Sequence, residues 1–425
     1  MCSLVNLASE HPWRTTVWRP RRNIVIFVVA VLALLLAIRM CIQNHVTFVL
    51  LGVNRLPNNP TTPTESVLIQ QTRRPTSSES PTVHLVHVLK GEATFKRSLT
   101  LLKSVFYYQG RLRSNRSECS LRRTPSPKPC SQQRTPERTP IHLHLIAELK
   151  LWSTINDFVS QWRVQQFQWT LYDLDDYLPR VSWIPDSHYA GVVTVAKMIV
   201  PDILPINLTK AIVLDTDILL NANILYLWDL FANFTQKQIF GAAWEPYSDH
   251  PRCGEPPIPT GGVNSGVVLM HLSRMREAGW SDMFIEETKK ILLVYKDLSG
   301  GEQSVLNKLI RKRPELYYRV PCEWHVQLWY EEVHRCCPVI WTDRLPEETI
   351  CPERDSSEPG NINHPGTPNL VHFCAGAKKP EGGISPPKFI RTIPVPSKTQ
   401  TRDELRAKFL EVYWSFNAVA QTCYD

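Results

Sequence analysis

A short apolar strand that ends in two aspartates constrains this 425-residue chain more than any other feature. The run Ala211–Leu214 is apolar without interruption, which is typical of a strand buried on both faces of a parallel sheet. It ends abruptly in Asp215, Thr216 and Asp217. Because open α/β sheets bind ligands at the carboxyl ends of their strands, we expect these carboxylates at a ligand site. Taken alone, an Asp-x-Asp pair occurs too often to decide, and the alternative is a turn in which one aspartate caps the next helix.

The surrounding pattern alternates strands with helices and predicts one α/β domain over residues 82–425. We expect a mostly parallel central sheet flanked by helices. The predicted strands are 82–89, 141–146, 211–214, 267–270 and 370–373, and the predicted helices are 94–108, 156–168 and 305–310. His142 and His144 share one face of their strand, and a polar strand face explains them better than a metal site does.

The N-terminal region predicts a membrane anchor. Residues 24–42 are apolar apart from Arg39, and a helix of this length spans about 28 Å. Four arginines precede the segment, so 1–23 is expected to be a cytoplasmic tail. The alternative is a cleaved signal peptide, but no small-residue cleavage site follows. Residues 43–81 are rich in Pro, Thr and Ser and predict a stem that leads to a lumenal domain.

Charge is concentrated outside the predicted core. The whole chain carries +8, of which residues 1–22 account for +3 and residues 110–140 for +6. The remainder is therefore close to neutral and offers no broad basic face for nucleic acid. We predict that 110–140 is a disordered insertion, a solvated loop rather than a docking site for an acidic partner.

Cysteines and sequons fit a lumenal body. Nine of the eleven cysteines follow residue 100, and this odd number predicts at least one unpaired or intermolecular thiol. No C-x-x-C pair exists, so a cysteine zinc site is not expected. Sequons begin at Asn115, Asn207 and Asn233.

Other polar residues near predicted strand and helix ends favour the same chemistry as the aspartate pair. Oxygen ligands suit Mn²⁺ or Mg²⁺ holding the phosphates of a nucleotide, a histidine completes such a site, and lysines hold a diphosphate. Taken singly, each residue has an ordinary explanation as a strand histidine, a tight turn or a helix cap. The candidates are Asn264, Gly266, Glu302, Gln303, His372, Lys378 and Lys379.

The order of these motifs resembles glycosyltransferase family 8, whose members are retaining enzymes with the GT-A fold. Four longer strings, at 141–148, 181–191, 212–218 and 321–328, are similar to the xylosyltransferase domain of LARGE-type glycosyltransferases. The resemblance covers about residues 82–420, with gaps. LARGE-type enzymes carry a second, glucuronyltransferase-type domain, for which these 425 residues leave no room. We therefore do not expect the chain to polymerise an alternating disaccharide unaided.

The resemblance implies a role for each candidate residue. Asp215, Asp217 and His372 are implied as ligands of Mn²⁺, or of Mg²⁺ in its place. Gln303, with Glu302, is implied at the catalytic position near the anomeric carbon of the sugar. The residues implied in binding the donor are Lys197, Asn264, Gly266, Lys378 and Lys379. The family's Asp-Gln-Asp stands here as Glu302, Gln303 and Ser304, and the spacing from histidine to lysine is one residue longer than in LARGE-type enzymes.

These features together predict a Golgi type II membrane glycosyltransferase with its catalytic domain in the lumen. It is expected to transfer a sugar, xylose by resemblance, with retention from a UDP-sugar to a glycan or glycoprotein acceptor, and a homodimer is left open. One alternative is a catalytically inactive family member that binds glycans or stabilises a partner. Another is a metal-dependent phosphohydrolase that uses the same aspartate pair.

Overall fold

The computed structural model describes residues 82–113, 117–121, 138–185, 188, 191, 193–246, 262–329, 336–340, 366–374, 380 and 401–425. The predicted tail 1–23, membrane segment 24–42 and stem 43–81 lie outside the described residues, as does most of the predicted insertion. Among the helices that are described, none is both long and apolar enough to cross a membrane.

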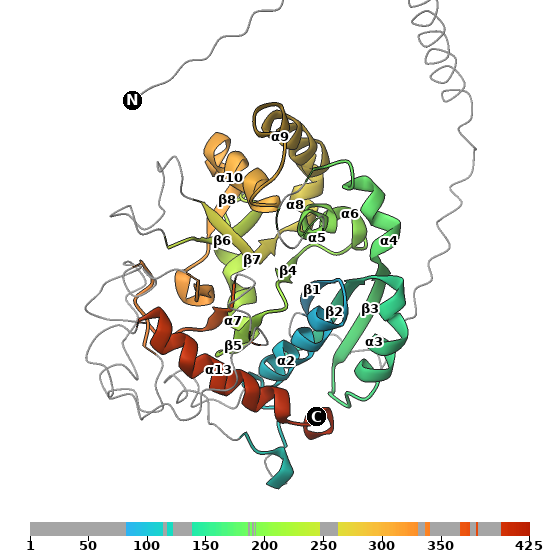
Figure 1. The fold of residues 1–425 in the computed structure, drawn as a ribbon, viewed down its shortest axis with the longest axis vertical. Coiled ribbons are helices and arrows are strands. Elements are labelled where there is room, and N and C mark those ends of the chain that lie inside the picture. The colour runs from blue at the N-terminus through green and yellow to red at the C-terminus, as the bar shows by residue number, and fades with distance from the viewer. Residues whose placement is uncertain are drawn as a thin grey trace, which may run out of the picture. The chain divides into compact units, whose positions relative to one another are not determined.

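A seven-stranded mixed sheet, in the order β3-β2-β1-β4-β7-β6-β8, forms the centre of the domain (Figure 1). Strands β3, β2, β1 and β4 are parallel to one another, β7 runs antiparallel to β4 and to β6, and β8 is parallel to β6. This is the mostly parallel α/β sheet that the sequence predicts. The strands are β1 Val83–Leu89, β2 Ile141–Ala147, β3 Phe167–Asp173, β4 Ala211–Leu214, β6 Phe240–Trp244, β7 Val263–Met270 and β8 Tyr317–Arg319.

Helices cover both faces of this sheet. The α-helices are α2 Glu92–Tyr108, α3 Trp152–Val159, α4 Leu174–Tyr177, α5 Val193–Ala196, α6 Val200–Ile203, α7 Ile224–Trp228, α8 Leu272–Glu277, α9 Trp280–Tyr295, α10 Glu302–Lys312 and α13 Arg402–Ala418. Short 3-10 helices lie at Ser117–Cys119, Leu149–Leu151, Leu178–Arg180, Lys197–Ile199, Asp229–Asn233, Pro314–Leu316, Cys322–Trp324 and Gln421–Cys423.

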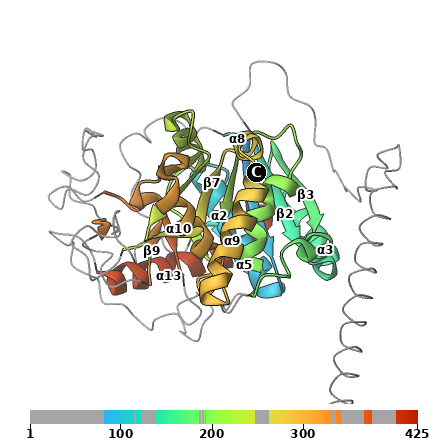
Figure 2. The same ribbon diagram turned by 90° about the horizontal axis from the view of Figure 1, so that it is seen from above.

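Two apolar cores, one on each face, explain why β4 is apolar throughout. Ile212 and Leu214 pack in the core shared with α2, α3, α7 and α13. Ala211 and Val213 pack in the core shared with α5, α6, α8, α9 and α10. In Figure 2, the labelled helices of this second group, α5, α8, α9 and α10, lie in front of the strands. A strand covered on both faces buries every side chain, which favours an unbroken apolar run over alternation.

The predicted helix 156–168 is wrong in its second half. Helix α3 begins at Trp152 and ends at Val159, and Phe167–Asp173 forms β3, which pairs with β2 along its length. Gln166, directly before the strand, has a φ of 55°, in the left-handed region that helices do not use. The alternation of Phe167, Trp169 and Leu171 with polar residues is the strand signal that the sequence analysis missed.

A smaller three-stranded sheet, in the order β5-β10-β9, lies beyond the end of β4. Its strands are β5 Ile218–Leu220, β9 Val326–Gln327 and β10 Leu370–His372. Strand β10 is antiparallel to β5 and parallel to β9. Strand β10 of this sheet places His372, the histidine of the predicted strand 370–373, beside Ile218, which follows Asp217.

Disulfides tie distant parts of the domain together. Cys119 is bonded to Cys423, 304 positions away, and Cys322 is bonded to Cys337. The first bond holds the segment after α13, a helix that packs on α2, against the segment after α2. Cys374 is a buried free thiol, in agreement with the odd cysteine count.

Arg111 lies within the predicted insertion but belongs to the folded core. Its side chain is buried, and its guanidinium donates to the side-chain oxygen of Gln109 and to the backbone carbonyls of Thr139 and Gln165. The solvated loop that the sequence predicts therefore does not begin at residue 110.

Candidate functional site

Asp215, Asp217 and His372 meet at the carboxyl end of β4, and we call them the aspartate-histidine site. His372 Nε2 lies 3.7 Å from Asp215 Oδ2 and 3.5 Å from Asp217 Oδ1. Backbone bonds fix the turn between the carboxylates: the amide of Asp215 donates to the carbonyl of Gly266, and the amide of Phe373 donates to the carbonyl of Asp217. These contacts join β4 to β7 on one side and to β10 on the other.

The donor set of this site fits a divalent cation. One atom from each of the three side chains lies within 4.8 Å of the others. Two carboxylate oxygens and one imidazole nitrogen suit Mn²⁺ or Mg²⁺ better than a soft metal. Gly266 leaves the room that the imidazole needs, because a Cβ at this position would lie 2.4 Å from Cε1 of His372. The residues present therefore fit the metal that the sequence predicts.

A second histidine, His325, orients His372. His325 Nε2 and His372 Nδ1 are 2.9 Å apart, and the two rings are stacked. Burial, together with the neighbouring His372, lowers the pKa of His325 well below its ordinary value, so this ring is neutral at neutral pH. A hydrogen bond to Nδ1 of His372 leaves Nε2 directed at the carboxylates, which is the arrangement expected behind a metal ligand. His325 stands in the 321–328 string, yet the sequence analysis gave it no role.

Lys197 is the central cation of the site. Its Nζ lies 2.7 Å from Asp215 Oδ1 and 2.9 Å from Glu302 Oε1, and it donates to the carbonyl of Ser265. Burial alone would lower the pKa of Lys197, but the charges of Asp215 and Glu302 and the hydrogen bonds to them outweigh burial and raise it. The lysine therefore remains charged and holds two carboxylates that would otherwise repel each other.

Glu302 and Gln303, at the start of α10, bind Ser265 of β7. Ser265 donates from its hydroxyl to Glu302 Oε1 at 2.6 Å and from its amide to Gln303 Oε1 at 3.0 Å. Gln303 Nε2 donates to Glu245 at the end of β6, and the amide of Gly266 donates to the side chain of Asn264. The predicted catalytic pair is thus part of a network that fixes the strand next to the aspartates.

These residues line a cavity of about 230 Å³ that opens to solvent. Arg97 of α2 adds a second cation to it and contacts Thr216, while Trp329 adds an exposed aromatic ring. The Cys374 thiol also lines the cavity, and burial, followed by the charge of Asp217, raises its pKa. This thiol is therefore not activated as a nucleophile.

The structure brings most of the predicted site residues together. Those that line this cavity are Lys197, Asp215, Asp217, Asn264, Glu302, Gln303 and His372. Gly266 lies beside them under His372, whereas Lys378 and Lys379 lie outside the described residues. The sequence analysis missed Arg97, Thr216, Glu245, His325 and Trp329. A basic residue on the first predicted helix was visible in the sequence, but nothing there placed it near residue 215.

A family model described as "Glycosyl transferase family 8" matches residues 141–380. The xylosyl- and glucuronyltransferase LARGE2 of Rattus norvegicus is 30% identical over 257 residues, which cover 58% of this chain and 32% of the relative. The xylosyl- and glucuronyltransferase LARGE1 of Homo sapiens is 28% identical over 267 residues, which cover 60% and 31%. The chain thus spans about a third of the length of these curated relatives.

Among solved structures, mouse xyloside xylosyltransferase 1 in its apo form aligns with 69% of this chain and 97% of its own, at 18% identity and a TM-score of 0.45.

Proposed function

Because this chain belongs to glycosyltransferase family 8, we propose that it is a metal-dependent enzyme that transfers a sugar from a UDP-sugar to a glycan or glycoprotein acceptor. The observation that carries this proposal is the aspartate-histidine site in the wall of a cavity, within the segment that the family model matches. An inactive member of the family would be under no constraint to keep this donor set together.

Asp215, Asp217 and His372 are the residues proposed to hold the cation. When bound, Mn²⁺ or Mg²⁺ would neutralise the diphosphate of the donor and stabilise the charge that develops on the leaving group. Lys197 and Arg97 are the fixed cations of the described cavity wall, and we assign them to the same diphosphate. Lys378 and Lys379 remain further candidates for this role.

Transfer breaks the bond between the anomeric carbon and the β-phosphate oxygen and forms one to the acceptor oxygen. The anomeric centre gains positive character in the transition state, so a nearby amide or carboxylate oxygen stabilises it. Gln303 is the residue proposed for that contact, while Glu302 positions Lys197 and Ser265. Retention by attack on the same face needs no protein base, since the departing phosphate accepts the proton of the acceptor.

Xylose is the sugar that we propose for the donor. Support comes from the relatives, which are named xylosyl- and glucuronyltransferases, over a segment that is 30% identical in the rat protein. Ser304 stands where the family has an aspartate beside Gln303. A panel of donors tests whether this difference changes the choice of sugar.

The proposed location is the Golgi membrane, with the body in the lumen. The disulfides of the body are typical of an oxidising compartment. Asn207 and Asn233, which begin two of the sequons, are both exposed. A smaller glycosidase-sensitive mobility shift in an Asn207→Gln, Asn233→Gln double variant from eukaryotic cells tests this orientation. No shift in the unsubstituted chain would contradict it.

The deciding experiment measures UDP release by the full chain, secreted or extracted from a eukaryotic host, with Mn²⁺ and a panel of UDP-sugars. We expect release from UDP-xylose, its loss in Asp217→Asn, and its retention in Asp202→Asn. Asp202 is a matched control because it lies on α6 in a surface ion pair with Arg180.

Three other results would overturn the proposal or redirect it. UDP release from a different sugar would replace xylose while keeping the enzyme. Mn²⁺-dependent binding of UDP without turnover would favour the alternative of an inactive, partner-stabilising protein, in which the ion pair between Glu302 and Lys197 is purely structural. Release of inorganic phosphate instead of UDP would favour a phosphohydrolase.

A further inference from the structure

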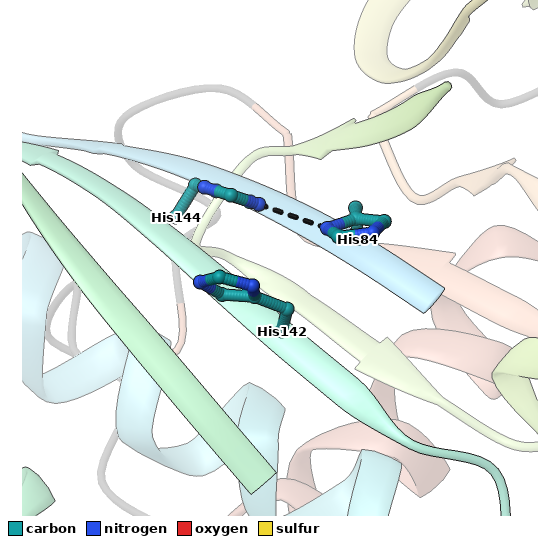
Figure 3. Close-up of side chains that lie close together, drawn as sticks. All are labelled: His84, His142 and His144. Atoms are coloured by element: carbon teal, nitrogen blue, oxygen red, sulfur yellow. Dashed lines mark hydrogen bonds between the residues drawn. The ribbon is translucent and has the colours of Figure 1, made fainter. Parts of the chain in front are cut away.

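A second group of side chains that could bind a metal lies toward the amino-terminal ends of the parallel strands, opposite the aspartate-histidine site. His84 on β1 and His142 and His144 on β2 form what we call the histidine cluster (Figure 3). Because β1 and β4 are parallel and Leu85 is level with Ile212, His84 is level with Ala211. Asp215 lies four residues further along, or about 13 Å at the rise of a strand. The cluster is therefore separate from the aspartate-histidine site.

Strand register explains how three histidines meet. His84 and His142 are directly paired across β1 and β2, and His144 follows His142 on the same face. His84 Nδ1 and His144 Nε2 are 3.0 Å apart, and the rings of His142 and His144 are stacked with centroids 4.2 Å apart. One nitrogen from each of the three rings lies within 4.8 Å of the others.

Hydroxyl groups on β3 hold the far side of two rings. His142 Nε2 lies 2.8 Å from the hydroxyl of Thr170, and His144 Nδ1 lies 3.0 Å from that of Tyr172. These contacts leave Nδ1 of His142 and Nε2 of His144 as the nitrogens for a shared position beside His84. A ring whose second nitrogen is hydrogen-bonded to a neighbouring strand is the usual form of a metal-binding histidine.

The rings are available as neutral ligands. Burial lowers the pKa of His84 to about 4, with a further contribution from His142, and burial lowers the pKa of His142 to about 4 as well. The pKa of His144 lies well below its ordinary value for the same reasons. Near neutral pH each ring therefore keeps an unprotonated nitrogen, which is the form that binds a metal.

We propose that His84, His142 and His144 bind one Zn²⁺-type transition-metal cation, with water at the fourth position. Three imidazole nitrogens without a carboxylate suit zinc, copper or nickel rather than magnesium or calcium. Two nitrogens on a tetrahedral zinc at ordinary bond lengths are about 3.3 Å apart, close to the 3.0 Å between His84 and His144. Such an ion crosslinks β1 to β2 at their amino-terminal ends.

The competing explanation is a hydrogen-bonded polar face, in which one ring donates to the next. That explanation accounts for the 3.0 Å contact between His84 and His144. It requires nothing of His142, whose ring is stacked on His144 and bonded to Thr170. The observation that favours a metal is that a nitrogen of the third ring, His142, lies within 4.8 Å of the other two nitrogens. The proposal is independent of the proposed transferase activity.

The test titrates the full chain, stripped with a chelator, with Zn²⁺ alone and with Co²⁺ as a visible probe. Tetrahedral, nitrogen-bound Co²⁺ absorbs strongly, whereas an oxygen-rich octahedral site absorbs weakly. We expect one equivalent of the strongly absorbing Co²⁺, displaced by Zn²⁺, and a higher melting temperature with Zn²⁺. This equivalent should persist in Asp217→Asn and disappear in His142→Gln and in His84→Gln.

His271→Gln is the matched control, because His271 is also buried and hydrogen-bonded but lies outside both sites. It should bind the metal as the unsubstituted chain does. Absence of the tetrahedral band in the unsubstituted chain overturns the proposal, whatever the variants do. A band that survives in both folded histidine variants, as judged by their metal-free melting curves, overturns it equally.

Discussion

Two groups of ligating side chains lie at opposite edges of one sheet, and they differ in the atoms they offer. The aspartate-histidine site presents two carboxylates and one imidazole beside the charged Lys197. The histidine cluster presents three imidazoles and no carboxylate. The histidine cluster lies on the parallel pair β1 and β2, whereas the aspartate-histidine site joins the end of β4 to β10 of the smaller sheet. The comparison shows that strand pairing provides the geometry, while the residue types at the strand ends decide which cation each edge is suited to hold.

The largest expected effect separates the two sites by activity. Asp217→Asn should lower UDP-sugar turnover by about 10³-fold or more, since a charge-stabilising cation contributes several kcal/mol to the transition state. His142→Gln should leave turnover within about twofold, because the cluster is remote from the cavity. Steady-state UDP release measures both variants. A large loss in His142→Gln would show that the two edges are coupled.

A smaller effect is expected from replacing Lys197, a cation beside the aspartate-histidine site that has no counterpart in the histidine cluster. Lys197→Met should lower turnover by about 10²-fold by removing a fixed charge near the leaving group. It should also reduce the free energy of unfolding by about 3 kcal/mol, because Asp215 and the buried Glu302 lose their partner. Urea unfolding and UDP release are the two measurements.

The double variant Lys197→Met, Glu302→Gln tests the cause of that instability. Removing the unpaired carboxylate should restore part of the unfolding free energy but not the turnover. Equal stability of the single and double variants would contradict the ion-pair explanation.

The glycine beneath His372 should show a moderate effect. Gly266→Ala places a methyl group 2.4 Å from the imidazole, so the ring must move. We expect at least about a tenfold loss in Mn²⁺ affinity, as for other displaced ligand supports. Gly241→Ala on β6 is the control, because its methyl group would meet Phe234 and Tyr318 instead. Equal Mn²⁺ affinities in the two variants would remove the proposed role of Gly266.

The last comparison concerns the pH dependence of stability of the metal-free chain. In the folded state the pKa values of His84 and His142 are about 4, against 6.5 ordinarily. Between these values the unfolded chain binds more protons, so stability falls as the pH drops from 6.5 toward 4, by at most about 1.4 kcal/mol per pH unit for each ring. A His84→Gln, His142→Gln double variant should show a shallower dependence in urea unfolding. Above pH 7 the two dependences should coincide, and a difference there would point to another cause.

The family resemblance implied Asp215, Asp217 and His372 as one metal site, and the structure brings these three side chains together. Asp215, Asp217 and His372 each follow or end an apolar strand, and such positions are visible along one chain. His325 was missed because its role depends on a contact with a residue 47 positions away. The same limit applies to the histidine cluster: His142 and His144 were seen to share a face, but His84 reaches them only through the pairing of β1 with β2.

The error at β3 has a local cause. The sequence analysis extended the helical pattern of residues 156–159 across Gln166, whose left-handed backbone ends any helix. The predicted fold class is still correct, because one additional parallel strand does not change an α/β sheet into another class. The buried Arg111 had no signal in the sequence, because a run of basic residues ordinarily predicts a solvated loop.

The bond between Cys119 and Cys423 turns most of the described domain into a covalent ring. A protease that cuts once between these two positions would leave both pieces attached, and they would separate only under reducing conditions. In a chain that lacks Cys423, α13 would still be held on α2 by packing and by the hydrogen bonds of Asn417 with Lys103 and Thr100. Cys119 would then be a thiol without its partner.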